Sequence, residues 1–475
     1  MRGLAWIVLA FAAAAGAAVW LLVSWRSNAG AVPLRADLAA DVDRGSLADL
    51  GRAQALGRRL ALANSGDREA AARWAFASAA LASDYGVDTT RETADALAHF
   101  GSEPPNDEAS VIAASARALD RLYVGSRDAA GQLAAGAAAV DSDQPQPLYA
   151  LGRVRARAGD LPAAARALEA AIIRAPGFVA ARSAWAEVEL DLGDAKAARE
   201  TLQALRAQAP ADLHIALLLN EAEAGLDVKT PPLADCPTDR WLPASVIATC
   251  TLARAERARR DGSRADARKL AEAAAVAAPE EPRLLSRIAL ALCQLGAVDR
   301  ASGLVERARR SMAPTAPAFA WAAAAVSLGR GRASGLPAGA RPSDPDVRLL
   351  VARANLAAGG VGALSSTLDQ LGAGAPAHDV DLAELARLRA DGRAPAHASA
   401  DDPVRAFVEG LRARLDGKLD VAADRLRHAL SGHGDACRAA GEYRATLRAL
   451  KQQPDPAAFA PLRAENADCV NLPRR

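Results

Sequence analysis

A spacing of 34 residues between turn-forming residues limits what this chain can fold into more than any other feature. Gly125, Gly159 and Gly193 follow one another at this interval, and Pro176 and Pro210 repeat it. Self-similarity at a fixed period is the signature of a repeat architecture, in which each unit buries its apolar face only against its neighbours. The 475-residue chain is therefore expected to be an array of stacked units rather than one compact globule.

The residues between these markers are typical of helices. Ala, Leu and Arg are abundant, aromatic residues make up only 4%, and these three residue types lose little conformational freedom in a helix. In block 145–178 the order is a helix, an Ala158-Gly159-Asp160 turn, a second helix and then Pro176, which cannot continue a helix. The predicted fold class is all-α, with one helical hairpin in each unit.

The order of small and large residues in these hairpins resembles that of the tetratricopeptide-repeat (TPR) family. In block 145–178 the positions that are small, proline or large in that family hold Gly152, Ala164, Ala171, Pro176, Leu151 and Leu168. The resemblance implies a solenoid of helical hairpins wound into a right-handed superhelix, with a surface for protein-protein interaction. The same frame fits blocks 179–212, 248–281, 282–315, 345–378 and 403–436. It fits blocks 111–144 and 52–85 less closely, the latter with Gly66-Asp67 in the turn position, and it leaves 86–110 as an irregular spacer.

These blocks and the segments between them give the expected domain organisation. Two segments rich in Pro or Gly break the repeat, because neither can be regular helix. We expect an N-terminal anchor at 1–31, a degenerate helical region at 32–110, a first TPR array at 111–227, a Pro-rich loop at 228–247, a second array at 248–328, a Gly/Pro/Arg-rich linker at 329–344, a third array at 345–436, and a capping helix and tail at 437–475.

An uncharged run, Gly3–Val23, lies near the start of the chain, with Arg2 and Arg26 on its flanks. At about 1.5 Å per residue, a helix of this length spans about 30 Å, the thickness of a hydrocarbon core. We expect a transmembrane helix that holds the chain as a single-pass protein in a bacterial inner membrane, with the repeats on the periplasmic side. The alternative is a signal peptide, cleaved near Ala13-Ala14-Ala15, that would release a secreted protein.

The five cysteines bear on the compartment. Cys236 and Cys250 flank the Pro-rich segment, Cys437 and Cys469 bracket the C-terminal helical end, and Cys293 falls inside a repeat helix. Two disulfides, Cys236–Cys250 and Cys437–Cys469, with one buried thiol would suit an oxidising compartment. Five thiols in the cytosol are the alternative, because spacing alone does not fix pairing.

The chain lacks the sequence signatures of catalysis. It contains no Gly-x-Ser-x-Gly elbow, His-Glu-x-x-His pair or Walker sequence. Its 58 basic and 56 acidic residues give a net charge of +2 and no field that would attract nucleic acid. His428, His433, Asp435 and Cys437 could supply metal ligands, but a helix connection and a disulfide explain them without a metal. We expect no enzyme activity, no cofactor, no metal site and no small-molecule substrate.

The resemblance also implies where a partner would bind. In TPR proteins the groove is lined mainly by the first helix of each unit, at its second, fifth, ninth and twelfth positions. The candidate partner-binding residues that match those positions are Tyr149, Arg153, Ser183, Glu187, Glu256, Arg259, Arg353, Phe407 and Arg414. The arginines among them could form forked hydrogen bonds with carboxylates of a peptide segment.

Three functions follow from this reading. The first is a non-catalytic, membrane-anchored scaffold that brings other proteins together in the bacterial cell envelope. The second is a chaperone or biogenesis factor, of the type that acts in cytochrome maturation or secretion, which would hold unfolded segments. The third is a structural spacer with no ligand in its groove.

Overall fold

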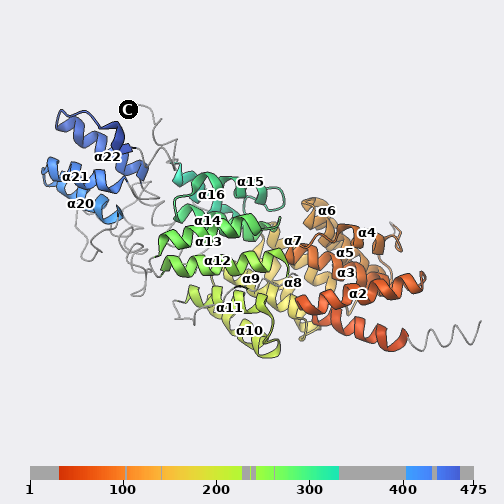
Figure 1. Ribbon diagram of the computed structural model, residues 1–475. Helices are drawn as coiled ribbons and strands as arrows, with labels where there is room; N and C mark the ends of the chain where they lie inside the picture. The colour runs from red at the N-terminus through yellow and green to blue at the C-terminus, as the bar shows by residue number, and fades with distance from the viewer. Residues whose placement is uncertain are drawn as a thin grey trace, which may run out of the picture.

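A computed structural model describes residues 31–101, 104–140, 142–226, 236, 242–260, 263–330, 403–430 and 436–459. All regular secondary structure in these ranges is helical, so the predicted all-α class is confirmed for them (Figure 1). The predicted block 345–378, most of the linker 329–344 and the predicted anchor up to residue 30 lie outside the described residues. No helix in the described part of the chain is long and apolar enough to span a bilayer.

Helical hairpins follow one another along the chain. The N-terminal helices are residues 31–44, α2 (Leu47–Ala63), α3 (Arg68–Tyr85) and α4 (Thr90–Leu97). The hairpins of the first predicted array are α5 (Glu108–Tyr123) with α6 (Arg127–Ala138), α7 (Gln146–Arg157) with α8 (Leu161–Arg174), and α9 (Val179–Leu192) with α10 (Ala195–Gln208), followed by α11 (Leu213–Gly225).

The second predicted array consists of α12 (Ala244–Arg260) with α13 (Arg264–Ala277), α14 (Pro282–Gln294) with α15 (Val298–Ala308), and α16 (Pro317–Gly329). Helix α12 begins inside the segment 228–247 that was expected to be a loop. Near the C-terminus lie α20 (Pro403–Leu415), α21 (Leu419–Ala429), α22 (Ala436–Ala449) and a short 3-10 helix, Pro456–Phe459.

The 34-residue period has a backbone cause. Gly125, Gly159 and Gly193 each lie between the two helices of a hairpin, with φ angles of 85°, 83° and 91°. L-residues with a Cβ rarely adopt this left-handed conformation, whereas glycine ends a helix in it without steric penalty. In two of these turns an aspartate then caps the second helix: Asp160 accepts from the Ala163 amide at 3.3 Å, and Asp194 accepts from the Ala197 amide at 2.9 Å.

Within a hairpin the helices approach closely where the sequence places small residues. A Cβ built on Gly152 would lie 2.5 Å from Cγ of Leu168, so no larger residue fits between α7 and α8 without movement. Gly410 is in the same situation in α20, where a Cβ would lie 2.7 Å from Cγ of Leu426. The small residues at these two positions thus lie where the two helices of each hairpin pack closely.

The N-terminal region departs from the expected frame. Residues Gly66 and Asp67 do separate two helices, α2 and α3, but the supposed irregular spacer 86–110 contains the helix α4. Helix α3 is buried on nearly every side, as its run of Ala with Trp74 and Phe76 would require. It therefore serves as a central element of the N-terminal part rather than as a surface helix.

Apolar side chains gather in several clusters. The largest contains buried residues from Leu38 to Ala253, and a smaller one lies between α9, α10 and α11. A third extends from Ala248 to Val326, and a fourth, from Ala406 to Phe459, belongs to α20–α22 and the 3-10 helix. Helix α12 contributes to both the first and the third cluster, so it joins residues 31–226 to residues 242–330.

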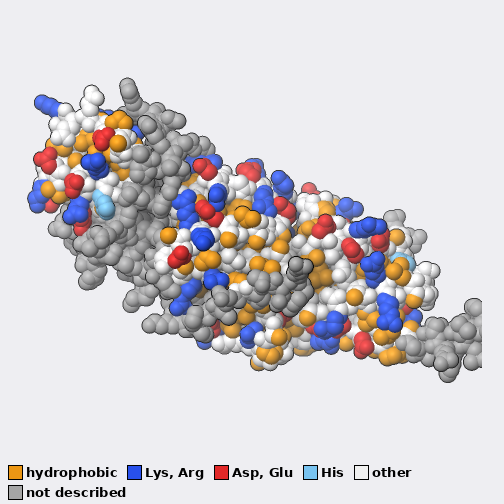
Figure 2. Space-filling view, viewed as in Figure 1, with side chains coloured by type: hydrophobic (Ala, Val, Ile, Leu, Met, Phe, Trp, Pro, Cys, Tyr) orange, Lys and Arg blue, Asp and Glu red, His pale blue; other side chains and the backbone are white. Residues whose placement is uncertain are grey.

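The face of the molecule drawn in Figure 2 carries Lys or Arg side chains interspersed with Asp or Glu, with no broad area of one sign. This distribution agrees with the net charge of +2 over the whole sequence. A surface of mixed sign does not attract a polyanion over long distances.

Candidate partner-binding site

Charged side chains from the first helices of successive hairpins meet inside the array. We call this set the inner charged cluster. Its members are Asp84 at the end of α3, Arg153 and Arg157 of α7, Glu187 and Asp191 of α9, His214 and Glu221 of α11, Glu256 of α12, Glu281 just before α14, and Arg283 and Arg287 of α14.

Arg153 lies at the centre of one half of this cluster. Its Nε is 3.0 Å from Asp84 Oδ1, its Nη1 donates to Glu187 Oε2 at 2.7 Å, and only 9% of its side chain is exposed. Burial disfavours a charge here, but Asp84 and Glu187 outweigh it and raise the pKa of Arg153 further. The hydroxyl of Tyr149 also donates to Asp84.

Neighbouring cationic side chains keep the carboxyl group of Glu187 ionised. Burial acts to raise the pKa of its carboxyl group, but the charge of Arg153 and the adjacent His214 hold that pKa far below its usual range. His214 Nε2 lies 3.6 Å from Glu187 Oε1. Burial opposes the charged imidazole, yet Glu187, Asp212 and Asp84 together raise the pKa of His214 above its ordinary value.

Two arginines of α14 hold the other half of the cluster. Arg283 pairs with Asp191 at 3.1 Å and with Glu221 at 2.8 Å. Arg287 pairs with Glu221 at 2.6 Å and with Glu256 at 3.1 Å. Each arginine therefore bridges carboxylates from two other helices, and α14 is tied to α9, α11 and α12 by charge-assisted hydrogen bonds.

A cavity of about 40 Å³ remains inside the cluster. Its lining residues come from both halves of the array: Asp84, Arg153, Glu187, His214, Leu218, Ser245, Val246, Thr249, Glu281, Arg283, Leu284 and Arg287. A cavity of this size has room for a few water molecules at most. It is too small for a peptide segment.

Three of the candidate partner-binding residues, Arg153, Glu187 and Glu256, come together in the inner charged cluster. There they pair within the chain instead of facing solvent. Ser183 in α9 and Arg259 in α12 are also buried, at 6% exposed each. Of these five side chains, Arg153, Ser183 and Arg259 are buried, whereas Glu187 and Glu256 are 14% and 18% exposed.

The remaining candidates are in different surroundings. Tyr149 is fully buried and packs its ring against Phe76 and Phe178, and Phe407 is 1% exposed in the core of α20–α22. Arg414 is about one-third exposed and pairs with Glu442 of α22. Arg353 lies outside the described residues. Partner binding by these residues stays a prediction, because accessibility in one structure does not test it.

Several members of the cluster are not among the candidate residues, although the repeat frame contains a signal for them. Arg283 occupies the second position of block 282–315. A block started at Leu213 would place His214 at the second position and Glu221 at the ninth. The pattern of that block is incomplete in the sequence, because Pro231, Pro232 and Pro237 fall where its second helix would be expected.

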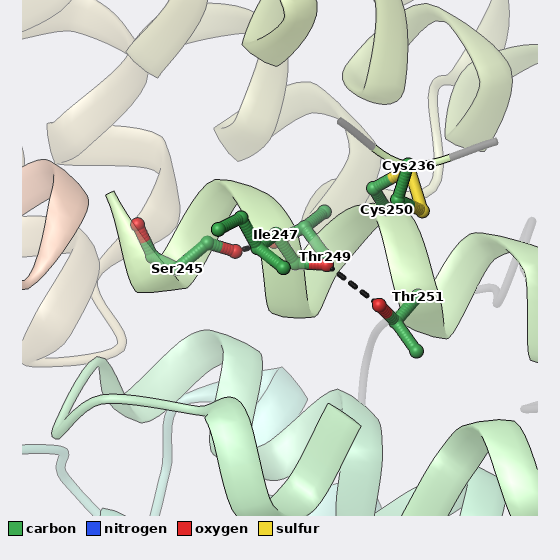
Figure 3. The surroundings of a disulfide bond; sticks show 6 residues. All are labelled: Cys236, Ser245, Ile247, Thr249, Cys250 and Thr251. Carbon is green, nitrogen blue, oxygen red and sulfur yellow. Dashed lines mark hydrogen bonds between the residues drawn. A yellow bond between two sulfur atoms is a disulfide. The ribbon is translucent and has the colours of Figure 1, made fainter. Parts of the chain in front are cut away.

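The predicted pairing of Cys236 with Cys250 is confirmed. Their Cα atoms are 5.8 Å apart, and the disulfide links Cys236 to the middle of α12, where Cys250 is buried (Figure 3). Cys293 is buried in α14, as expected. The other predicted pair involves Cys469, which lies outside the described residues.

In α12, threonines on either side of Cys250 bond back to their own helix. Thr249 donates to the carbonyl of Ser245 at 2.7 Å, and Thr251 donates to that of Ile247 at 2.8 Å (Figure 3). Ser245 donates to the carbonyl of Tyr85 at 2.5 Å and so connects α12 to the end of α3. The first half of α12 is therefore linked to Cys236 by the disulfide and to the end of α3 by the hydrogen bond of Ser245.

A second, more open cleft of about 560 Å³ lies between residues 31–44 and α2. Asp37, Asp41, Arg44, Arg52 and Arg59 are among its lining residues. Arg52 pairs with Asp41 at 3.0 Å, and Arg44 pairs with Asp49 at 3.1 Å, so much of the charge is compensated locally. Within the ranges that the structure covers, no group of three or more His, Cys, Asp or Glu side chains is arranged to hold a metal.

Comparison with known proteins gives one family match. Residues 155–222 match the profile of the family described as tetratricopeptide repeat. No curated protein matches the chain. One similar solved structure is that of a Rap protein complexed with competence and sporulation factor, at 13% identity and a TM-score of 0.35, over 76% of this chain and 97% of that chain.

Another is the structure of Naa15/Naa10 bound to HypK-THB, at 14% identity and a TM-score of 0.27, over 90% of this chain and 66% of that chain. The matched segment 155–222 runs from the end of α7 through α11 and includes the hairpin α9/α10. The tetratricopeptide-repeat match is confined to residues 155–222, and helical hairpins continue on both sides of it in the described part of the chain.

Proposed function

We propose that this protein is a non-catalytic, membrane-anchored scaffold that binds other proteins in the bacterial cell envelope. The observation that carries the proposal is the TPR match at 155–222 within a longer array of helical hairpins. Stacked hairpins provide extended surfaces, and proteins of this architecture use them for binding other proteins. Membrane anchoring rests on the uncharged run Gly3–Val23.

The Cys236–Cys250 disulfide supports the envelope location. Disulfides persist in oxidising compartments such as the periplasm and are rare in the cytosol. An anchor with the repeats on the periplasmic side would place this bond where it is stable. The same bond is also compatible with the alternative of a secreted protein.

Site-specific photo-crosslinking in living cells tests the scaffold function. A photoreactive amino acid would be placed, one position at a time, at exposed residues on different hairpins, such as Ile173 of α8 and Val276 of α13, with buried Leu168 as the matched control. We expect the same crosslinked proteins to recur from neighbouring exposed positions and not from Leu168. Absence of any recurring product from exposed positions in every hairpin would contradict the proposal.

Membrane anchoring needs its own experiment. The full chain should remain in the membrane pellet after alkaline carbonate extraction, and protease added to spheroplasts should digest the repeats. A matched variant that lacks residues 1–30 should be released. N-terminal sequencing of the mature protein separates an anchor from a cleaved signal, because cleavage would remove Met1 and the residues after it.

A structural spacer is the second candidate, and the inner charged cluster favours it. Arg153 pairs with Glu187, and Glu256 pairs with Arg287, so these three candidate residues already have partners within the chain. A spacer would yield no recurring crosslinked partner, yet its deletion or shortening would still disturb the assembly that it separates. The crosslinking experiment therefore distinguishes the two candidates.

A further inference from the structure

Residues 31–226 and 242–330 meet along a line of turns as well as through the inner charged cluster. A Cβ on Gly86 would lie 2.8 Å from Cγ of Pro279, and one on Gly125 would lie 2.9 Å from the carbonyl oxygen of Arg310. A Cβ on Gly159 would lie 2.8 Å from Oγ1 of Thr315. We call these contacts the turn seam.

Hydrogen bonds connect the two sides of the turn seam. The amide of Ala313 donates to the carbonyl of Arg157 at 3.0 Å, and Thr315 Oγ1 donates to the carbonyl of Ala158 at 3.2 Å. These turns are far apart in sequence, so the array has curled until its later hairpins touch its earlier ones. Two of the three contacts meet a carbonyl or hydroxyl oxygen and the third meets the Pro279 ring, while α12 adds apolar packing between the same two parts.

The inner charged cluster lies between the same two parts of the chain. Arg283 joins α14 to Asp191 and Glu221, and Arg157 Nη2 lies 3.6 Å from Glu281 Oε1. Arg287 of α14 also pairs with Glu221 of α11, whereas Asp84 and Glu187 pair with Arg153 inside the earlier part. Ion pairs of Arg283, Arg287 and Arg157 therefore cross between the two parts.

We propose that the array closes on itself, with α14 and the turn seam acting as a clasp over the inner face of α7, α9 and α11, and that this face is open to a partner only when the clasp is released. The part of the proposal that concerns a partner rests on the proposed scaffold function. Closure itself does not, and it can be measured without any ligand. A charged segment of a partner could form charge-assisted hydrogen bonds with the same side chains in place of α14.

Chemical modification of arginine tests closure directly. Phenylglyoxal would be applied to the full chain, and the modification rate of each arginine followed by mass spectrometry. In the native chain we expect exposed Arg58 and Arg59 to react and buried Arg153 and Arg157 to be protected. In the double variant Arg283→Gln, Arg287→Gln, the rates at Arg153 and Arg157 should rise at least about tenfold, since a closed state that dominates by 99:1 can hide a site about a hundredfold.

A second pair of variants separates release of the clasp from loss of folding. Gly159→Ala introduces a Cβ into the turn seam, while Gly417→Ala introduces one at an equivalent turn with φ of 75° and no atom within 4 Å. Both substitutions strain a left-handed backbone, so only the seam contact differs. Gly159→Ala should raise the rates at Arg153 and Arg157, and Gly417→Ala should leave them unchanged.

A distance measurement provides an independent readout. Spin labels on unnatural amino acids at exposed Ile173 and Val276 report the separation of α8 from α13. Variants with a released clasp should show a population at longer distance while circular dichroism retains the native helix content. The proposal is overturned if Arg153 and Arg157 stay as protected as in the native chain, or if they react only together with global loss of helix. If closure is observed but the crosslinking above finds no partner, the proposed function fails and the closure stands.

Discussion

The hairpins α7/α8 and α20/α21 share one local design and differ in what surrounds them. In both, a glycine of the first helix lies against a leucine of the second, and a left-handed glycine joins the two helices. In α7/α8 that turn touches the later part of the array, and Arg153 is buried between two carboxylates. In α20/α21 the turn has open space around it, and Arg414 is about one-third exposed.

The comparison shows that the repeat pattern determines the packing inside a hairpin. It does not determine the surroundings of the first-helix face that carries Arg153 in one hairpin and Arg414 in the other. The same first-helix face is an interior surface in one hairpin and is partly exposed in the other. Substitutions that change packing inside a hairpin should therefore have equal effects on the stability of the two hairpins. Substitutions on that first-helix face should have unequal effects.

Replacement of the two arginines by methionine should show the largest difference. Arg153→Met leaves Asp84 and Glu187 buried with less compensating charge, and such a loss costs about 3–5 kcal/mol. Arg414→Met removes a partly exposed pair with Glu442, for which the loss is about 0–1 kcal/mol. Hydrogen exchange measured on peptides from each hairpin gives the two local opening free energies within one chain. Equal losses would show that the burial of Arg153 has no energetic consequence.

The two close-packed glycines should behave alike. Gly152→Ala and Gly410→Ala each place a Cβ within 2.8 Å of a leucine side chain. Overpacking costs about 1–3 kcal/mol, and the gain in helix propensity returns about 1 kcal/mol of it. We expect a similar net loss at both sites in the same exchange experiment.

Controls for this pair come from exposed helix positions. Gly136 of α6 and Gly441 of α22 have no atom within 4 Å of a built Cβ, so their change to alanine should stabilise the helix slightly. A loss at Gly152 without one at Gly410 would mean that the two hairpins are not packed in the same way.

The pH dependence of the first hairpins should report His214. Burial lowers the pKa of the His214 imidazole in the folded state, but Glu187 on α9, Asp212 just before α11 and Asp84 on α3 together raise it above the ordinary value. The ring of Tyr85 contacts that of His214, and Arg153 lines the same cavity. Because the pKa of His214 is raised in the folded state, the protonated side chain stabilises the fold fully below the ordinary pKa of 6.5. This stabilisation is lost as the pH rises through the folded-state pKa.

The opening free energy of α9 and α11 should therefore fall between slightly acidic and mildly alkaline pH, and exchange data corrected for the intrinsic pH effect would show it. His214→Gln should flatten that profile, while the α20–α22 peptides serve as the internal reference. A slope that persists in His214→Gln would assign the effect to other groups.

Exposed apolar residues should show the smallest effect. Ile173 of α8 is 73% exposed and Val421 of α21 is 52% exposed. Exchange of either for serine should change stability by less than about 0.5 kcal/mol, since single exposed apolar side chains contribute little. A clear loss at one of them, measured by the same exchange protocol, would reveal a packing contact that differs between the hairpins.

Much of the fold could be predicted from the chain's own pattern. The blocks 111–144, 145–178, 179–212 and 282–315 each correspond to a helical hairpin, and the Cys236–Cys250 pair is present. The helix α4 was missed because the expected spacer 86–110 has no repeat spacing to mark it. The unit that starts with α11 was missed because its sequence has Pro231, Pro232 and Pro237 where a second helix would be expected.

The candidate site could be predicted only as a set of positions. The frame selected Arg153, Glu187 and Glu256, all of which do reach one interior cluster. It could not show that α14 supplies their counter-charges, because no local rule brings residue 283 to residue 191. Tyr149 was selected by the same frame, yet its ring packs into the core against Phe178.

The sequence by itself determined where helices turn and where they pack closely. Glycine is required at φ angles near 80°, as at Gly125 and Gly159, and only a very small residue fits opposite Leu168. These are short-range steric demands, and they leave their mark at a fixed spacing.

Tertiary structure alone decided which charged positions became interior. Whether a first-helix arginine meets solvent or a carboxylate depends on the summed curvature of several hairpins, to which each unit contributes a small rotation. That sum brings Arg283 to Asp191 and Thr315 to the turn at Ala158, while the equivalent turn at Gly417 has open space around it. No single repeat encodes the closure, because the closure is a property of their succession.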